Sequence, residues 1–460
     1  MTEGETAESV PGPWAESGVA SVTDRGAAVP AAAGDVAQVV EHLFRHEAVR
    51  MIAILTRVFG IEHLTLAEDV VQDTLARALQ TWPYHGIPEN PSAWILRAAR
   101  NRALDVVRRE TNFRGKEAEI IRVMDRSVPS PDASDVFEQE VSDDCLRMMF
   151  VCCHPQLPNE AQVALALKTL CGFGVAEIAR AFLTTEAAVA KRLTRAKQWI
   201  RDARIPFEIP AGEALTERVA GVWRSLYLLF NEGYKASMGD QLVRTDVCHE
   251  AIRLATLLAE HPAGNRPETQ ALLALMYLNA ARFPARVDDD GNLLRLREQD
   301  RSRWDPAMLA RGFFHLARST SSGPISEYHL QAGIAVSHAA AGSFEATDWR
   351  RILMLYDQLL ELAPSPVVAL NRAIVVAQVA GARAGLDAVA AIPQREKLKG
   401  YYLLYAVLGD LEFQRGDGLA AASWFRQAAQ RTDLKSEQTF LSRRADEAAA
   451  FAAAVKTGCP

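Results

Sequence analysis

The chain has 460 residues, of which 49% are hydrophobic and 23% charged, and its formal net charge at pH 7 is −6. This balance is typical of a soluble globular protein with two or three domains, and it excludes a wholly disordered chain. The net acidity does not indicate nucleic-acid binding, but such binding depends on local basic patches that the total conceals.

The N-terminus begins with acidic residues and lacks the basic start and apolar core of a signal peptide. No apolar run reaches the length that spans a bilayer. We therefore expect a cytoplasmic protein without a membrane partner. Residues 1–35 are rich in Ala, Gly, Pro and Ser, and we expect this tail to be disordered.

The six cysteines do not indicate a disulfide framework in a cytoplasmic chain of this length. Cys152, Cys153 and His154 follow Cys145 closely, but neighbouring cysteines diverge on a helix and no CxxC pair is present. Buried, apolar cysteines are the favoured interpretation, and a zinc or redox site is the alternative. We expect no metal ion and no other cofactor.

Residues 36–110 have the periodicity of three helices, at 36–59, 64–81 and 92–109. The second contains AEDVVQDTLARAL, residues 67–79, which is amphipathic and has an acidic, amide-bearing face. A loop with several prolines then stops the helix. The face consists of Glu68, Asp69, Gln72 and Asp73.

The third helix, within AWILRAARNRALDVVRRE, is rich in arginine and has Trp94 at its start. An aromatic ring beside an arginine-rich helix is suited to hold an unstacked base on a DNA strand. For any single residue here a solvated helix face is the simpler interpretation, but the order of the two helices favours the functional one. The residues concerned are Trp94, Arg97, Arg100, Asn101, Arg108 and Arg109.

A polar linker at 111–140 leads to residues 141–205, which contain a helix-turn-helix that ends in a basic helix. Apolar residues have the spacing that packs two helices across a tight turn, and Thr185 supplies an N-cap. The turn carries Leu183 where glycine is usual, and a plain helical hairpin is the alternative. The apolar residues are Ile178, Ala179, Phe182, Val189 and Leu193.

A basic helix presented in this way can lie in the major groove of DNA. It reads base edges near its N-terminus and holds phosphates further along. The residues expected to face DNA are Thr185, Glu186, Ala188, Lys191, Arg192, Arg195 and Lys197.

Residues 211–455 show only helical periodicity, so we expect an all-α protein with two small domains and a large helical C-terminal domain. Small and bulky apolar residues alternate over 401–431 as in a tetratricopeptide helix pair, and 368–392 is a weaker copy. The turns at Gly381 and Gly416 match the period of about 34 residues. Such repeats stack into a concave surface that binds protein; a helical bundle without a ligand is the alternative.

The charged segment at 287–305 interrupts this periodicity. It is not a calcium-binding loop, because Arg286 and Arg297 would occupy the first and twelfth positions, where carboxylates are required. Two interpretations stay open: a loop that contacts the other domains or a partner, and a surface turn capped by its aspartates, with Arg295, Arg297 and Trp304 packing locally.

Together these motifs resemble bacterial RNA polymerase sigma factors of group 4, the extracytoplasmic-function type. Residues 67–79 are similar to the region 2 helix that binds the polymerase clamp, and 91–109 to the helices that melt and read the −10 element. Residues 177–197 are similar to the region 4 helix-turn-helix that reads the −35 element. The resemblance covers nearly everything after about residue 36.

Segments at 150–173, 226–234, 289–305 and 364–373 further resemble one subfamily of these factors. Its members carry a C-terminal extension with tetratricopeptide-like repeats and a short D-G-G-N-L motif. In this chain Asp290 replaces the first glycine of that motif. The motif residues are Asp289, Asp290, Gly291, Asn292 and Leu293.

The resemblance implies a dissociable promoter-specificity subunit whose partners are core RNA polymerase, through its clamp and flap regions, and promoter DNA. It implies that residues 36–110 bind the clamp and open the −10 element, and that residues 141–205 read the −35 element. The C-terminal domain would be the control element, with the 289–293 motif at the contact and a protein or ligand bound by the repeats. No catalytic motif is present, so we expect no enzyme.

Two other classes stay open on the sequence. An autonomous DNA-binding regulator with a ligand-sensing helical domain would bind DNA without polymerase, but it leaves the acidic helix at 67–79 unexplained. A repeat-based scaffold protein whose basic helices are solvated faces would not bind DNA.

Overall fold

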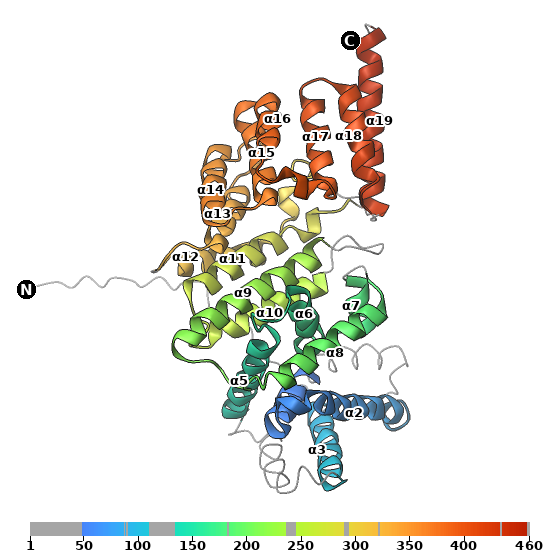
Figure 1. Cartoon of the computed structure of the whole chain (residues 1–460), viewed down its shortest axis with the longest axis vertical. Helices are drawn as coiled ribbons and strands as arrows, with labels where there is room; N and C mark the ends of the chain where they lie inside the picture. Colours follow the sequence, from blue (N-terminus) through green and yellow to red (C-terminus); the bar gives the residue numbers. More distant parts are fainter. Residues whose placement is uncertain are drawn as a thin grey trace, which may run out of the picture.

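The computed structural model describes residues 48–86, 88, 91–109, 134–181, 184–235, 245–288, 294–320, 323–432 and 435–457. About 78% of the structure is helical and the described residues form no β-strand, which confirms the all-α prediction. The chain is elongated, with α2 and α3 at one end, α17 to α19 at the other, and α9 to α11 between them (Figure 1). The expected tail at 1–35 lies outside the described residues.

The described residues begin with a helical segment at 48–59, which the short turn η1 (Ile61–His63) joins to α2. The elements up to the middle of the chain are α2 (Leu64–His85), α3 (Pro91–Arg109), α5 (Ser134–Cys152), α6 (Asn159–Leu165), η3 (Ala166–Leu170), α7 (Val175–Ala181), α8 (Glu186–Asp202), α9 (Gly212–Lys235), α10 (Thr245–Glu260) and α11 (Pro267–Ala280). Then follow η4 (Phe283–Ala285), η5 (Arg301–Arg303), α12 (Pro306–Ser319), α13 (Glu327–Ala339), α14 (Trp349–Leu362), α15 (Pro366–Ala380), α16 (Ala382–Ala390), η6 (Arg395–Leu398), α17 (Tyr402–Gln414), α18 (Gly418–Ala429) and α19 (Lys435–Thr457).

Side-chain caps fix where several of these helices begin. Thr185 Oγ1 accepts a hydrogen bond from the backbone N–H of Ala188 at the start of α8, as the sequence predicts. Asp417 accepts from the N–H of Ala420 at the start of α18. These bonds satisfy donors that have no partner within the helix. One boundary differs: α5 begins at Ser134, inside the expected linker at 111–140.

One hydrophobic core runs from the first helices through the middle of the chain, from Ala48 to Ala280, with Tyr328 added from α13. Helix α9 lies against α5 and α6 because Gly221 lets it approach the backbone oxygen of Cys153, where a Cβ would come within 2.9 Å. Ser225 donates to Gln162 Oε1 at 2.6 Å across the same contact. The expected boundary near residues 205–211 therefore falls inside a continuous core.

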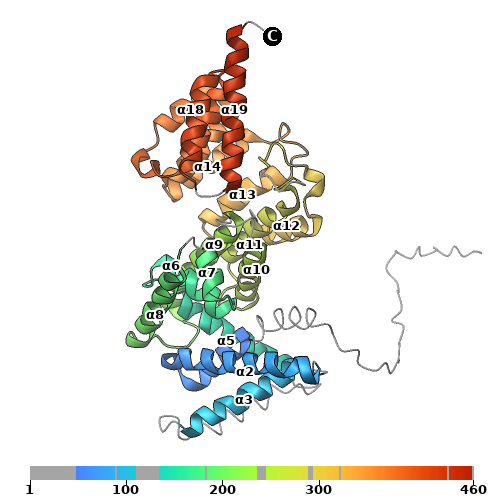
Figure 2. The same ribbon diagram turned by 90° about the vertical axis from the view of Figure 1, so that its right-hand side faces the viewer.

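Near the end of the chain α15 packs against α16 and α17 against α18 (Figure 1), and Figure 2 shows α18 beside α19. Gly381 and Gly416 form their turns, both with φ at 89°, a backbone conformation that favours glycine. Gly409 admits the ring of Phe425, since a Cβ there would lie 2.9 Å from it. Helix α19 packs along α18 and closes the stack.

Candidate functional site

The helix-turn-helix predicted from the sequence is formed by α7 and α8. Ile178, Ala179, Val189 and Leu193 are buried, as their spacing requires, and they hold the two helices together. Phe182 and the turn residue Leu183 lie outside the described residues. With these apolar positions inward, the polar face of α8 is left on the surface.

Five of the seven residues expected to face DNA lie along this face without a described ion pair. Glu186, Lys191 and Arg195 are exposed, and so is the cap residue Thr185, whereas Ala188 is half-buried. A surface helix that exposes Lys191 and Arg195 one turn apart has the geometry that a major groove accepts.

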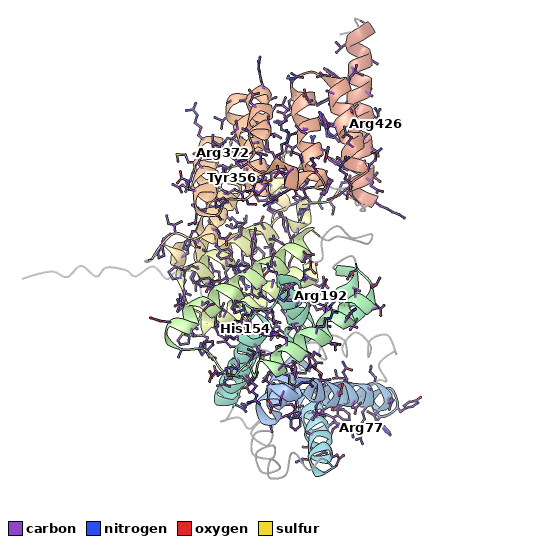
Figure 3. The ribbon with its side chains drawn as sticks, viewed as in Figure 1. Arg77, His154, Arg192, Tyr356, Arg372 and Arg426 are labelled. Atoms are coloured by element: carbon purple, nitrogen blue, oxygen red, sulfur yellow. The ribbon has the colours of Figure 1, made fainter. Side chains whose placement is uncertain are left out.

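The other two residues, Arg192 and Lys197, are engaged within the protein. Arg192 on α8 forms an ion pair with Glu160 at the start of α6, with 2.5 Å between Nη2 and Oε2 (Figure 3). Lys197 forms a buried ion pair with Glu68 at the start of α2. This second pair joins α8, which the sequence predicts to bind DNA, to α2, which it predicts to bind polymerase.

The acidic face of α2 is divided between the surface and the interior. Asp69, Gln72 and Asp73 are exposed, whereas Glu68 is buried. Asp73 accepts hydrogen bonds from Arg102 on α3, at 2.9 Å from Nε and 2.6 Å from Nη2. Three of the four residues expected to bind polymerase therefore remain accessible on one face.

The basic helix α3 presents Arg97 and Asn101 to solvent. Trp94 is half-buried and packs edge-to-face on the buried ring of Trp82, with 5.5 Å between the ring centres. The side chains of Arg100, Arg108 and Arg109 lie outside the description. Trp94 therefore sits at the edge of a small aromatic core, with part of its ring accessible.

A further set of contacts between the two small domains was missed by sequence reasoning. Asp144 on α5 is fully buried and lies 3.3 Å from Arg57 Nε of the first helical segment, and Arg147 binds it at 2.5 Å. Leu257 of α10 packs on Val49 and Ile54 beside this contact. No local motif marks these residues, because the pairing joins segments that are distant in sequence.

The described cysteines are all buried thiols without a disulfide. Burial raises the pKa of Cys153 to about 12 and that of Cys152 well above its usual value, so both are protonated and unreactive at pH 7. The described residues contain no group of three or more His, Cys, Asp or Glu side chains placed to hold a metal ion. No helix in the same part of the chain is long and apolar enough to cross a membrane.

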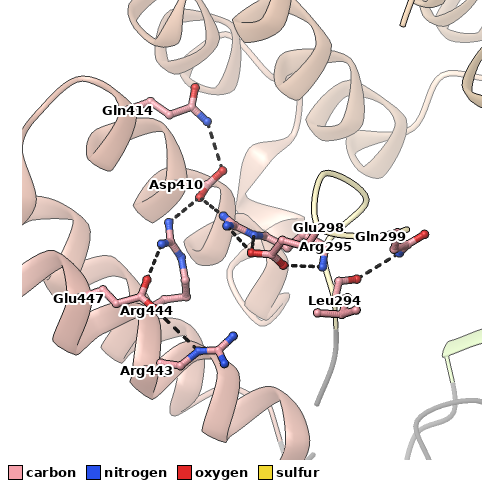
Figure 4. Close-up of polar contacts among 9 residues, drawn as sticks. All are labelled: Leu294, Arg295, Glu298, Gln299, Asp410, Gln414, Arg443, Arg444 and Glu447. Carbon is pink, nitrogen blue, oxygen red and sulfur yellow. Dashed lines mark hydrogen bonds and ion pairs between the residues drawn. The ribbon is translucent and has the colours of Figure 1, made fainter. Parts of the chain in front are cut away.

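The motif at 289–293 lies outside the described residues, but the segment that follows it is placed. Arg295 forms ion pairs with Glu298 at 2.6 Å and with Asp410 of α17 at 3.3 Å (Figure 4). Arg297 lies over the ring of Phe344, 4.6 Å from its centre. The segment is therefore bound to helices far along the C-terminal domain as well as packed locally.

Comparison with known proteins agrees with this geometry. Residues 43–113 match Sigma-70 region 2 and residues 147–200 match Sigma-70 region 4. Residues 218–320 match a family of unknown function, DUF6596. These matches support a sigma factor that binds RNA polymerase and recognises promoters.

A relative that spans nearly the whole chain is the uncharacterized protein R00370 of Rhizobium meliloti (strain 1021). It is 39% identical over 396 residues, which are 85% of this chain and 92% of the relative. No solved structure matches the chain. The chain therefore belongs to the same family as R00370, and its region 2 and region 4 domains identify it as a sigma factor of the sigma-70 type.

Proposed function

We propose that the chain is a group 4 sigma factor whose own C-terminal domain controls its activity. The observation that carries this proposal is the pairing, in one chain, of an exposed acidic face on α2 with an exposed basic face on α8. Asp69, Gln72 and Asp73 are the polymerase contacts, and Lys191 and Arg195 lie on the −35 reading face. Such a factor works beside RNA polymerase in the cytoplasm.

Arg97, Asn101 and Trp94 are the accessible −10 contacts in this proposal, with Arg100, Arg108 and Arg109 on the same helix. Glu186, Ala188 and Thr185 lie at the N-terminal end of α8, where base edges are read. Arg192 and Lys197 join them once they leave their ion pairs with Glu160 and Glu68.

The test measures polymerase binding and promoter choice separately. Substituting Asp69→Ala together with Gln72→Ala is expected to abolish binding to core polymerase, because both side chains lie on the proposed clamp face. Lys191→Ala is expected to leave polymerase binding unchanged and to alter which promoters are transcribed. Arg426→Ala, on the exposed side of α18, is the matched control (Figure 3). Full polymerase binding by the double variant would overturn the proposal.

The C-terminal domain is proposed to be a required part of the factor rather than a separable inhibitor. Arg218 of α9 donates to the backbone oxygen of Phe150 at 2.7 Å, and Arg253 of α10 donates to that of Leu170 at 2.8 Å. These bonds supply donors to two backbone oxygens of region 4 at its interface with the C-terminal domain, where a buried carbonyl without a donor is costly. In this proposal the repeat-like helices beyond α12 are joined to this base, and they carry the regulation together with the 289–293 motif.

Two truncations separate support from regulation. A chain ending at residue 210 loses α9 and α10 and is expected to lose transcription, because region 4 loses part of its core. A chain ending at residue 322 keeps those helices and removes only the distal ones. Loss of transcription by the longer fragment, with circular dichroism of a folded protein, supports a required regulatory role. Higher transcription from it would instead show an inhibitor.

A further inference from the structure

Two adjacent cavities, of about 440 and 720 Å³, lie among the described helices of the C-terminal domain. The smaller lies between α14, α15, α17 and α19, and the larger between α9, α11, α13 and α15. Four residues line both cavities: Leu296, His338, Tyr356 and Asn371. Leu296, which follows the 289–293 motif in the sequence, is one of these residues, and each cavity has a volume that suits a compact ligand.

The smaller cavity, which we call the Arg297 cavity, has mainly apolar walls. Aromatic rings form much of it, and Ile374 reaches it from α15. Its volume lies within the range of small-molecule sites, which are apolar with a few well-placed polar groups. The aromatic side chains are Phe344, Trp349, Tyr356, Phe425 and Phe440; Figure 3 labels Tyr356.

Most of the charged groups at this cavity already have partners. Asp410 accepts from Arg444 at 2.9 Å and from Arg295 at 3.3 Å (Figure 4). Arg444 also binds Glu447 at 2.7 Å, and Arg295 binds Glu298. This network holds Arg295, Asp410 and Arg444 in the wall of the cavity, and among the described residues only Arg444 Nε has no hydrogen-bond partner in it.

Arg297 differs from the other two arginines. Its guanidinium is exposed, rests on the Phe344 ring, and forms no ion pair or hydrogen bond with any residue in the described part of the chain. A guanidinium held in this way presents several N–H donors to the cavity mouth, in the fork geometry that matches an oxyanion. Within the described residues, two buried polar atoms on this lining have no hydrogen-bond partner, His338 Nδ1 and Arg444 Nε.

We propose that the Arg297 cavity binds a small amphipathic anion, in which a carboxylate or another oxyanion is attached to an aromatic or aliphatic body. The apolar body occupies the space between the aromatic side chains, and the oxyanion pairs with Arg297 at the mouth. Arg297 belongs to the segment that directly follows the 289–293 motif. A ligand bound to it therefore contacts the segment that the proposed function makes regulatory, and this link to regulation rests on that proposed function.

The experiment uses two fluorescent probes with the same ring system and the full-length protein. One is 1-anilinonaphthalene-8-sulfonate, which carries an anionic group, and the other is uncharged N-phenyl-1-naphthylamine. We expect one saturable site for the sulfonate. Arg297→Gln should weaken sulfonate binding roughly five- to tenfold, the effect of one charge-assisted contact at a partly solvated site, and leave the uncharged probe unchanged. Arg426→Gln, an exposed arginine on α18, should change neither.

A second variant tests whether the probes lie in this cavity. Ile374 is 37% exposed, so Ile374→Trp adds bulk to the cavity without displacing a core side chain. It should weaken both probes about tenfold or more. If its circular dichroism shows loss of structure, Gln378→Phe, one turn along α15, replaces it. The proposal is overturned if Arg297→Gln binds the sulfonate as tightly as the unchanged protein does. It is also overturned if the variant with the filled cavity, Ile374→Trp or Gln378→Phe, binds both probes with unchanged affinity. Neither readout depends on polymerase or DNA.

Discussion

The buried ion pair between Glu68 and Lys197 makes a prediction about how the two sigma domains hold together. It joins the start of α2 to α8, with the carboxylate side chain 7% exposed and the ammonium side chain 17% exposed. Glu68 Oε1 is buried and has no partner among the described residues. The ammonium group of Lys197, bound to Oε2, is therefore what offsets the cost of burying this carboxylate. Replacing only the lysine leaves a buried charge, which costs far more than replacing both groups.

The magnitude follows from this burial. Lys197→Met is expected to lower the free energy of unfolding by about 3 kcal/mol, the usual cost of stranding one member of a buried pair. Glu68→Gln with Lys197→Met should cost less than the sum of the single substitutions, because no charge is left behind. The coupling energy of this double-mutant cycle is expected to be about 2 kcal/mol. Urea unfolding of the full chain, followed by circular dichroism, gives the four free energies.

The pair between Arg192 and Glu160 is the matched control, since it involves the same helix α8. Its carboxylate side chain is 71% exposed, so the corresponding cycle should give less than about 1 kcal/mol. Additive effects at Glu68 and Lys197, within about 0.5 kcal/mol, would refute the reasoning that this pair holds region 2 against region 4.

Three further outcomes are expected. Gly418→Ala should lower the melting temperature, because the added Cβ would lie 2.5 Å from a backbone oxygen of α19. Gly400→Ala is the control, since a Cβ there meets nothing within 4 Å and the melting temperature should not change. Burial lowers the pKa of His338 to about 4, so the folded state favours the neutral ring; the resulting stability is full above about pH 6.5 and is lost as the pH falls toward 4. Urea midpoints at pH 5 and 7.5 should show this loss, and His338→Gln should reduce it. Asp73→Asn should cost under about 1 kcal/mol of stability, since its ion pair with Arg102 is exposed, yet weaken core polymerase binding about tenfold in a titration.

Local signals in the sequence predicted the helices that form the two small domains. The expected helices at 64–81 and 92–109 correspond to Leu64–His85 and Pro91–Arg109. Apolar periodicity and a capping threonine act between near neighbours, so the sequence displays them directly. The helix α5 begins at Ser134, inside the expected linker at 111–140, and its first residues are largely acidic and polar.

The contacts between domains were not predictable in this way. Lys197 and Glu68 each lie on a helix face that reads as solvent-exposed, and only the fold reveals that these faces meet. The ion pair of Arg295 with Asp410 joins residues separated by 115 positions, for which no periodic pattern exists. Long-range pairing of single charged residues is decided by tertiary packing, so it leaves no local signal.

The most direct measurement is transcription in vitro with purified core polymerase on the DNA upstream of this chain's own coding sequence. The account predicts a transcript that appears only when the full chain is added and that is lost when Asp69 and Gln72 are both replaced by alanine. If no transcript appears, and the chain neither binds core polymerase nor melts promoter DNA with it, the account is contradicted and an autonomous DNA-binding regulator takes its place.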